Sequence, residues 1–262
     1  MFRATHWFRT TANQRAMLIS RADRLRMERA HVRAWPALRT ADIEGWLWRC
    51  SGGGSQRANS VSTIDFTGND PEAVVTRAET LYHAAGRKAQ FQVFDETSPP
   101  GLADLLQARG YRRGEPTVTM FKLPEAAAAD PDVEIRDQAW DEWLAVYLDG
   151  ITESRRSVNA EILQHIPQPR AFFGCRRDGR IVSTALCVAG HGCAVIECVT
   201  TRSDARRQGS ARAVLATLEH WAALQEIGLI GLQVVAHNAP AGALYRRLGF
   251  VTGATNNFWL EA

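Results

Sequence analysis

The sequence of 262 residues lacks an apolar run of about eighteen residues, the length that a membrane-spanning helix requires. It has only five cysteines, an odd number, and no Cys-x-x-Cys pair. Disulfide and metal-binding frameworks are therefore disfavoured, and we expect reduced thiols, a cytoplasmic location and no bound metal. The sequence also lacks a Gly-Lys-Ser/Thr loop and the three-glycine dinucleotide fingerprint, which argues against two common phosphate-binding loops.

A clear excess of charge of one sign occurs only in the N-terminal residues of the sequence. The formal net charge is +3, but residues 1–26 hold six arginines against the single acid Asp23, so the remaining chain is slightly negative. A nearly neutral body gives little support for a nucleic-acid partner, and we expect no membrane partner either. An Arg-rich start resembles a transit peptide, but we favour an irregular basic extension over residues 1–26, upstream of a natural start at Met27.

The central feature of the sequence is a loop between a predicted strand and a predicted helix. Residues 194–199 form an apolar run, and apolar residues recur at i, i+4 and i+7 spacing from Val214, which is typical of a helix face. Between them lies Arg206-Arg-Gln-Gly209-Ser-Ala211. Backbone N–H groups at a helix start lack internal partners, and glycine lets a ligand approach them closely. The loop therefore suits a pyrophosphate, although an ordinary turn with solvated arginines is the alternative.

A second motif follows about thirty residues later. A predicted buried strand over residues 229–236 leads into Asn238-x-x-Ala-x-x-Leu-Tyr245-x-x-x-Gly249-Phe250. In this order and spacing, the two motifs resemble the coenzyme A loop, Arg/Gln-x-x-Gly-x-Gly/Ala, and the following strand–helix motif of the GCN5-related N-acetyltransferases (GNAT). The resemblance is strong over about half the chain. It departs from the family at Ser203, where many members have proline.

The resemblance implies that acetyl-CoA is the cofactor and that CoA is the product. In the family, two central strands splay apart, and the pantetheine arm pairs with exposed backbone of one of them. By position, Val199 and Thr201 would supply these backbone contacts, and Asn238 would bind the pantetheine arm. The residues expected to hold the pyrophosphate are Arg206, Arg207, Gln208, Gly209, Ser210, Ala211 and Arg212.

Two residues are expected to act in catalysis. Tyr245 matches the tyrosine that protonates the departing sulfur in many members, with packing beneath Phe250 as the alternative. Glu197 lies on the predicted strand, on the face of Val199 by period-two alternation. It could accept the amine proton directly or through a water, or it could be paired with an arginine. Cys198 would then lie on the opposite face and pack in the core rather than act as a nucleophile.

The predicted fold class is α/β, a GNAT fold whose mixed, largely antiparallel sheet is flanked by helices, in two GNAT-like halves. Residues 132–262 would form the catalytic half, with the order β-α-α-β-β-β-α-β-α-β-β, after a linker over residues 124–131 that is bracketed by prolines. Residues 27–123 would form a degenerate half, because their only glycine-rich stretch, residues 52–54, is not followed by a good helix.

The predicted function is transfer of an acetyl group from acetyl-CoA to a primary amine of a small molecule or peptide. The alternative from another class is a non-catalytic CoA-binding sensor or interaction module. The loop recognises only CoA, so acyl chain length stays open at this point, as do the acceptor and the oligomeric state. Acidic side chains at Asp149, Glu153 and Glu161 could meet a cationic amine, but we favour a solvated helix face.

Overall fold

The computed structural model describes residues 19–125 and 128–262. The first helix of the described residues, α2 (Arg21–Ala34), begins inside residues 1–26, where we expected an irregular extension. The early start has a local cause, because the Ser20 side chain accepts from the Asp23 backbone and the Asp23 side chain accepts from the Ser20 backbone, a capping box. The expectation of an irregular extension is therefore wrong for residues 21–26, and residues 1–18 lie outside the described part.

The described strands form one mixed sheet, in which only the pairs β3–β4 and β9–β10 are parallel. Its spatial order is β1-β2-β3-β4-β11-β5-β10-β9-β8-β7-β6. The strands are β1 (Arg39–Ile43), β2 (Trp46–Cys50), β3 (Val61–Ser62), β4 (Gln90–Phe94), β5 (Arg112–Lys122), β6 (Val133–Arg136), β7 (Arg170–Arg177), β8 (Arg180–Gly190), β9 (Cys193–Thr201), β10 (Leu229–Val235) and β11 (Val251–Leu260).

Helices flank this sheet, as expected for the mixed α/β fold. They are α2, α3 (Pro71–Ala84), α4 (Leu102–Ala108), α5 (Asp141–Asp149), α6 (Glu153–Gln164), α7 (Ser210–Leu224) and α8 (Ala239–Arg247), with short 3₁₀ turns η1 (Arg57–Asn59) and η2 (Ser203–Ala205). None of the described helices is long and apolar enough to cross a bilayer.

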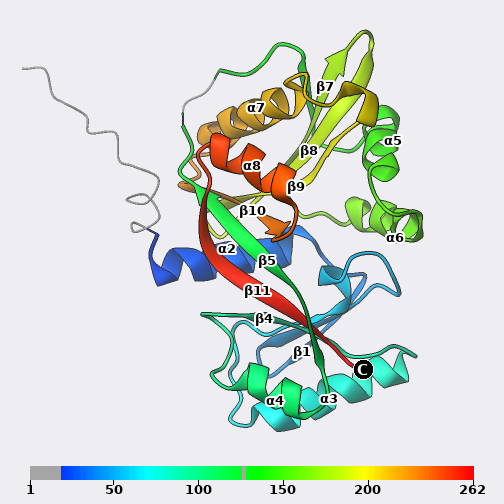
Figure 1. Ribbon diagram of the computed structural model, residues 1–262, viewed down its shortest axis with the longest axis vertical. Helices are drawn as coiled ribbons and strands as arrows, with labels where there is room; N and C mark the ends of the chain where they lie inside the picture. The colour runs from blue at the N-terminus through cyan, green and yellow to red at the C-terminus, as the bar shows by residue number, and fades with distance from the viewer. Residues whose placement is uncertain (1–18, 126–127) are drawn as a thin grey trace, which may run out of the picture.

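Two strands, β5 and β11, join the N-terminal and C-terminal parts of the sheet. β5 lies between β10 and β11, and β11 lies between β5 and β4. Figure 1 shows them running side by side through the middle of the molecule, between α3 and α4 at one end and α5 to α8 at the other. We expected two strands after α8, but only β11 follows it, and β5 fills the neighbouring place in the sheet.

The connectivity repeats across this central pair. The path β3-α3-β4-α4-β5 has the same element order as β9-α7-β10-α8-β11, and the strand order β3-β4-β11-β5-β10-β9 places the two paths symmetrically. Each path therefore ends in a strand that completes the other path's part of the sheet.

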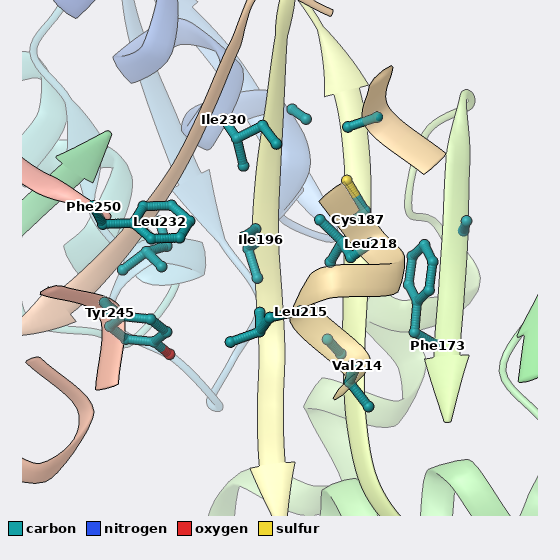
Figure 2. Close-up of a cluster of buried hydrophobic side chains, with 14 of the residues drawn as sticks. Phe173, Cys187, Ile196, Val214, Leu215, Leu218, Ile230, Leu232, Tyr245 and Phe250 are labelled. Carbon is teal, nitrogen blue, oxygen red and sulfur yellow. The ribbon is translucent and has the colours of Figure 1, made fainter. Parts of the chain in front are cut away.

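Three apolar clusters hold the layers together. The first packs α7 and α8 on β5 and β7 to β10, and Figure 2 shows Val214 and Leu218 of α7 above β8 and β9, with Phe173 beside them. The second packs α2, α5 and α6 against residues that include Phe172 and Val195. The third packs α3 and α4 on the N-terminal strands. Because α2 belongs to the second cluster, this N-terminal helix packs with elements of the C-terminal part of the chain.

Helix α2 also carries a buried carboxyl group. Glu28 is 1% exposed, and its Oε2 accepts a 2.5 Å hydrogen bond from the Thr97 hydroxyl. Burial raises the pKa of Glu28 to about 7, despite that hydrogen bond. A carboxyl whose pKa is higher in the folded state stabilises the fold while protonated, and this contribution is lost as pH rises from about 4.5 through 7.

We therefore predict that Glu28→Gln keeps the contact to Thr97 and stabilises the protein increasingly from pH 5 to 8. The expected gain at pH 8 is up to about 3 kcal/mol in the free energy of unfolding, because one pKa unit corresponds to about 1.4 kcal/mol. Urea denaturation at several pH values measures it, with Glu161→Gln on the exposed part of α6 as control. A constant difference between Glu28→Gln and wild type would contradict the prediction.

Candidate functional site

The parallel strands β9 and β10 separate part-way along their length. They pair from Cys193 and Leu229 up to Ile196 and Leu232. Beyond that point β9 continues to Thr201 beside β8, whereas β10 continues beside β5. We call the opening between residues 197–201 of β9 and residues 233–235 of β10 the wedge. A wedge between parallel strands exposes backbone groups that no neighbouring strand satisfies.

Backbone alternation directs two residues of β9 into the wedge. The Thr200 carbonyl accepts from the Ser183 hydroxyl at 3.0 Å, and the Arg202 N–H donates to Val182 at 2.9 Å, so these residues face β8. Successive residues of a strand direct their backbone groups to opposite edges. Val199 and Thr201 therefore face the open edge, where the expected pairing with a pantetheine arm would take place.

A β-bulge lies where the wedge begins. Leu186 pairs with Glu197 and Thr184 pairs with Thr200, so two residues of β9 lie opposite Ala185. Cys198 takes a φ of +55°, an uncommon conformation for a residue with a side chain. The bulge breaks the period-two alternation over these residues.

The bulge corrects our assignment of faces on β9. Glu197 and Cys198 both lie on the side of α2, whereas Val199 packs with the cluster beneath α7. We had placed Cys198 opposite Glu197 and Val199 on the same face as Glu197. Cys198 is half-buried, and burial raises the pKa of its thiol well above its usual value, as expected of a packing residue rather than a nucleophile.

The loop after β9 forms a cradle at the start of α7. Gly209 occupies the N-cap position with a φ of +86°, and a Cβ atom there would meet nothing within 4 Å. Arg207 also has a positive φ, +64°. The Ser210 hydroxyl is buried without a partner among the described residues. The side chains of Arg206, Arg207, Gln208 and Arg212 are exposed around this N-terminus, and Ala211 is half-buried.

Helix α8 borders the wedge on the other side. The Asn238 side chain caps it, because its Oδ1 accepts from the Ala241 backbone at 3.3 Å. The amide nitrogen of Asn238 is therefore the group left for a ligand. Tyr245 is 7% exposed and lies edge-on to Phe250, with ring centroids 6.0 Å apart. Figure 2 shows its hydroxyl directed toward β9.

The Tyr245 ring packs in the core, and its hydroxyl stays protonated at neutral pH. Burial raises its pKa to about 12, and the negative charge of Glu197 adds to the shift. Its hydroxyl has no hydrogen-bond partner in the described part of the chain. The packing alternative and the acid role are therefore compatible, since the ring fills the core while the hydroxyl points toward the strand that borders the wedge.

Glu197 is held in a buried ion pair. Arg57 binds both carboxylate oxygens, with Nη2 2.6 Å from Oε2, and the Arg57 guanidinium lies 5.7 Å from the ring centroid of Trp35. His31 of α2 places Nδ1 3.8 Å from Glu197 Oε1, beyond hydrogen-bonding distance. Burial lowers the pKa of His31, so its imidazole is neutral at neutral pH.

This pairing bears on the expected role of Glu197 as a base. Burial alone would raise the pKa of Glu197, but the charge and hydrogen bonds of Arg57 lower it to about 2. A carboxylate with so low a pKa has little tendency to take a proton from an amine. Pairing with arginine was the alternative for this residue, and the geometry favours it.

The sequence matches the family described as "Probable histone acetyltransferase Rv0428c C-terminal" over residues 22–258, which is most of the chain. The chain belongs to this family. A curated relative, the "Uncharacterized N-acetyltransferase YobR" of Bacillus subtilis (strain 168), is 25% identical over 236 residues, covering 86% of this chain and 93% of the relative.

Solved structures show that the fold is the GNAT fold. A GCN5-related N-acetyltransferase from Kribbella flavida superposes with a TM-score of 0.66 at 19% identity, covering 90% of this chain and 95% of that one. A tandem GNAT protein from the clavulanic acid biosynthesis pathway superposes with a TM-score of 0.59 at 15% identity, covering 77% and 74%. The expected GNAT assignment is thus confirmed at the level of family and fold.

The candidate site contains residues that the sequence did not single out as functional. Arg57 and His31 precede Glu197 by more than a hundred residues and come from η1 and α2, whereas the recognised motifs lie after residue 199. A lone arginine in a loop carries no signal of its buried partner, so spacing in the sequence could not identify this pair.

We predict that the Arg57–Glu197 pair couples the two parts of the chain. Arg57→Gln should destabilise the GNAT fold by about 3–5 kcal/mol, because it leaves a buried carboxylate without its cation. Adding Glu197→Gln should restore much of that loss. A double-mutant cycle by urea denaturation measures the coupling, and the exposed pair Arg180–Asp204 is the control, with an expected coupling much weaker than that of the buried pair. Equal coupling in both cycles would refute a structural role.

Proposed function

We propose that this chain is an N-acetyltransferase that moves the acetyl group of acetyl-CoA to a primary amine. The observation that supports this most directly is the wedge between β9 and β10, bordered by the Gly209 cradle on one side and by Tyr245 on the other. An extended pantetheine arm in the wedge would bring the thioester to the bulge at Cys198. A cytoplasmic location is part of the proposal, because all five cysteines are free.

The cofactor would be held by backbone groups and cations together. Val199 and Thr201 would pair with the pantetheine amides, a form of strand addition. The N–H groups at the start of α7 would bind the pyrophosphate, where the helix dipole favours negative charge. Exposed arginines, Arg206 and Arg207, would add charge, and the Asn238 amide nitrogen would reach the arm from α8.

The transfer needs one proton acceptor and one proton donor. The neutral amine nitrogen would attack the thioester carbonyl, the carbon–sulfur bond would break, the nitrogen would release one proton to solvent as the amide forms, and the thiolate would take one proton. Tyr245 would supply that proton, since its pKa of about 12 keeps the hydroxyl protonated at neutral pH. The acceptor ammonium loses its proton before attack, and we propose that Glu197, fixed by Arg57, positions the acceptor side of the site rather than accepting this proton itself.

We further propose that the chain is a tandem GNAT protein whose N-terminal half has lost cofactor binding. α3 occupies the place in its path that α7 occupies in the other. Its N-terminus is already filled, because the Asp70 carboxylate accepts from the backbone of Glu72 and Ala73, and Pro71 has no N–H. A carboxylate at that position repels a phosphate, so CoA should bind only beside β9.

We propose that the acceptor is a primary amine either of a protein or of a small molecule. The family name refers to histones, whose acceptor would be a lysine side chain of a protein, while a small-molecule amine uses the same chemistry. A panel of amines and lysine peptides with acetyl-CoA, read by free thiol release, distinguishes them. The alternative, a non-catalytic CoA-binding module, is not favoured, because the family and the curated relative carry acetyltransferase names.

Gly209→Val should lower acetyl-CoA affinity by well over about tenfold while the fold survives. A β-branched residue resists the positive φ and places methyl groups where the phosphate would approach the backbone. The matched control is Gly179→Val in the β7–β8 turn, where φ is +77° and the space is equally open. Calorimetric titration measures both variants. Unchanged affinity in a folded Gly209→Val protein would place the phosphates elsewhere.

Tyr245→Phe separates the enzyme from the binding module. It removes one proton donor and almost no volume, so stability and acetyl-CoA affinity should change little. The kcat should fall by about 10²–10⁴-fold, the usual contribution of a general acid, with KM for acetyl-CoA near wild type. Tyr111→Phe is the control for loss of a buried hydroxyl. The Tyr111 hydroxyl donates to Glu79, and the residue packs in the third apolar cluster. Full turnover in Tyr245→Phe would remove this residue from the mechanism.

A further inference from the structure

A second hollow lies beside α2, lined by both parts of the chain. It has a volume of about 580 Å³, and its walls come from α2 and the segment after it, from β2 and β3, and from two short loops around residues 165–167 and 191. We call it the α2 groove. It is separate from the wedge, because none of the residues that border the wedge lines it.

The α2 groove and the Glu197 cluster, which consists of Glu197, Arg57 and His31, lie on different faces of helix α2. Residues 27, 30, 31 and 34 pack toward the sheet and include His31 beside Glu197. Residues 29, 32 and 33, followed by Pro36, line the groove. A shift of two positions along a helix turns the side chain by about 200°, so these sets lie on nearly opposite faces of α2. One helix therefore separates the groove from the Glu197 cluster.

Arg49 supplies an unpaired buried charge to the groove. It is 1% exposed and shares its strand face with Leu47, which also lines the groove. Its hydrogen-bond acceptors are the Ser60 carbonyl at 2.9 Å, the Ser60 hydroxyl at 3.2 Å and Gln92 Oε1 at 2.8 Å. All three are neutral, and in the described residues its Nη1 has no acceptor. A buried cation without a counter-ion is costly unless an anion reaches it.

The other charged groups of the groove add to this imbalance. Arg33 donates to the carbonyls of Ala189 at 2.8 Å and Gln168 at 2.6 Å, which are neutral too. Asp65 is the single acidic residue in the described lining. Arg29 donates to its carboxylate through Nε and Nη2. The groove thus has two guanidinium groups that no carboxylate neutralises.

We propose that the α2 groove binds a small organic anion, a phosphate or carboxylate on a compact apolar body. Arg49 and Arg33 would bind the anionic group, since guanidinium groups match the geometry of both anions. The lining also includes the apolar side chains of Leu47, Ile64 and Val32, which would contact the body of the ligand. The volume suits a ligand of this size. This site is additional to the proposed acetyl transfer and does not depend on it.

Phenyl phosphate tests the proposal, with phenol as the matched neutral probe. Both are titrated by calorimetry into the full chain, in wild type and in Gly209→Val. Binding at the cradle would be lost in Gly209→Val, whereas binding in the α2 groove should persist there with an affinity within about twofold. The two sites are thereby distinguished even if the chain fails to bind acetyl-CoA. Phenol should not bind measurably, because it lacks the charge that Arg49 would meet.

Two variants in the Gly209→Val background locate the binding. Arg49→Gln should weaken phenyl phosphate by more than about tenfold, as expected when a buried charge pair loses one member. Ala37→Trp fills the groove without changing its charge and should abolish binding even if Arg49→Gln does not fold. Arg136→Gln, an exposed arginine of β6, is the control and should bind like its parent. The proposal is wrong if phenyl phosphate shows no saturable binding, or if Ala37→Trp leaves it unchanged.

Discussion

The antiparallel pairing of β5 with β11 is the constraint on which the rest of the structure depends. β5 forms the far neighbour of β10, and β10 is the strand that leaves β9 to open the wedge. β11, the last strand of the chain, completes the sheet beside β4 at the other end. Neither path of the sheet is closed by its own last strand. The wedge therefore forms only when both parts of the chain are folded together, although its recognised motifs all lie in one of them.

Helix α2 and the turn η1 also contribute to the candidate site, through side chains rather than strands. α2 packs in the second apolar cluster, and η1 brings Arg57 to Glu197 across 140 positions of sequence. The pair is largely buried, so each charge depends on the other for its stability in the core. The N-terminal part of the chain therefore contributes to this region of the fold, because Arg57 supplies the cation that stabilises the buried carboxylate of Glu197 at the bulge.

The sequence predicted those features that local chemistry determines. The glycine loop lies as expected between β9 and α7, and the strands around it, β9 and β10, have nearly the predicted bounds. β1 (Arg39–Ile43) escaped prediction because its residues are mostly exposed and show no apolar alternation. The bulge at Cys198 puts a non-glycine residue at positive φ without any sequence signal. The exchange of β5 and the Arg57–Glu197 pair depend on contacts between distant segments, which spacing cannot reveal.

The ion pair also bears on the acidity of the proposed proton donor. Tyr245 has a raised pKa chiefly because it is buried, and the negative charge of Glu197 raises it further. Arg57 binds the Glu197 carboxylate and carries the opposite charge. Its positive charge therefore offsets part of the electric field that Glu197 exerts at Tyr245. A tyrosine transfers its proton to a thiolate more readily when its pKa is lower, because the driving force for the transfer increases. Through Arg57, the N-terminal part of the chain thus influences the electrostatics at Tyr245 without touching the cofactor.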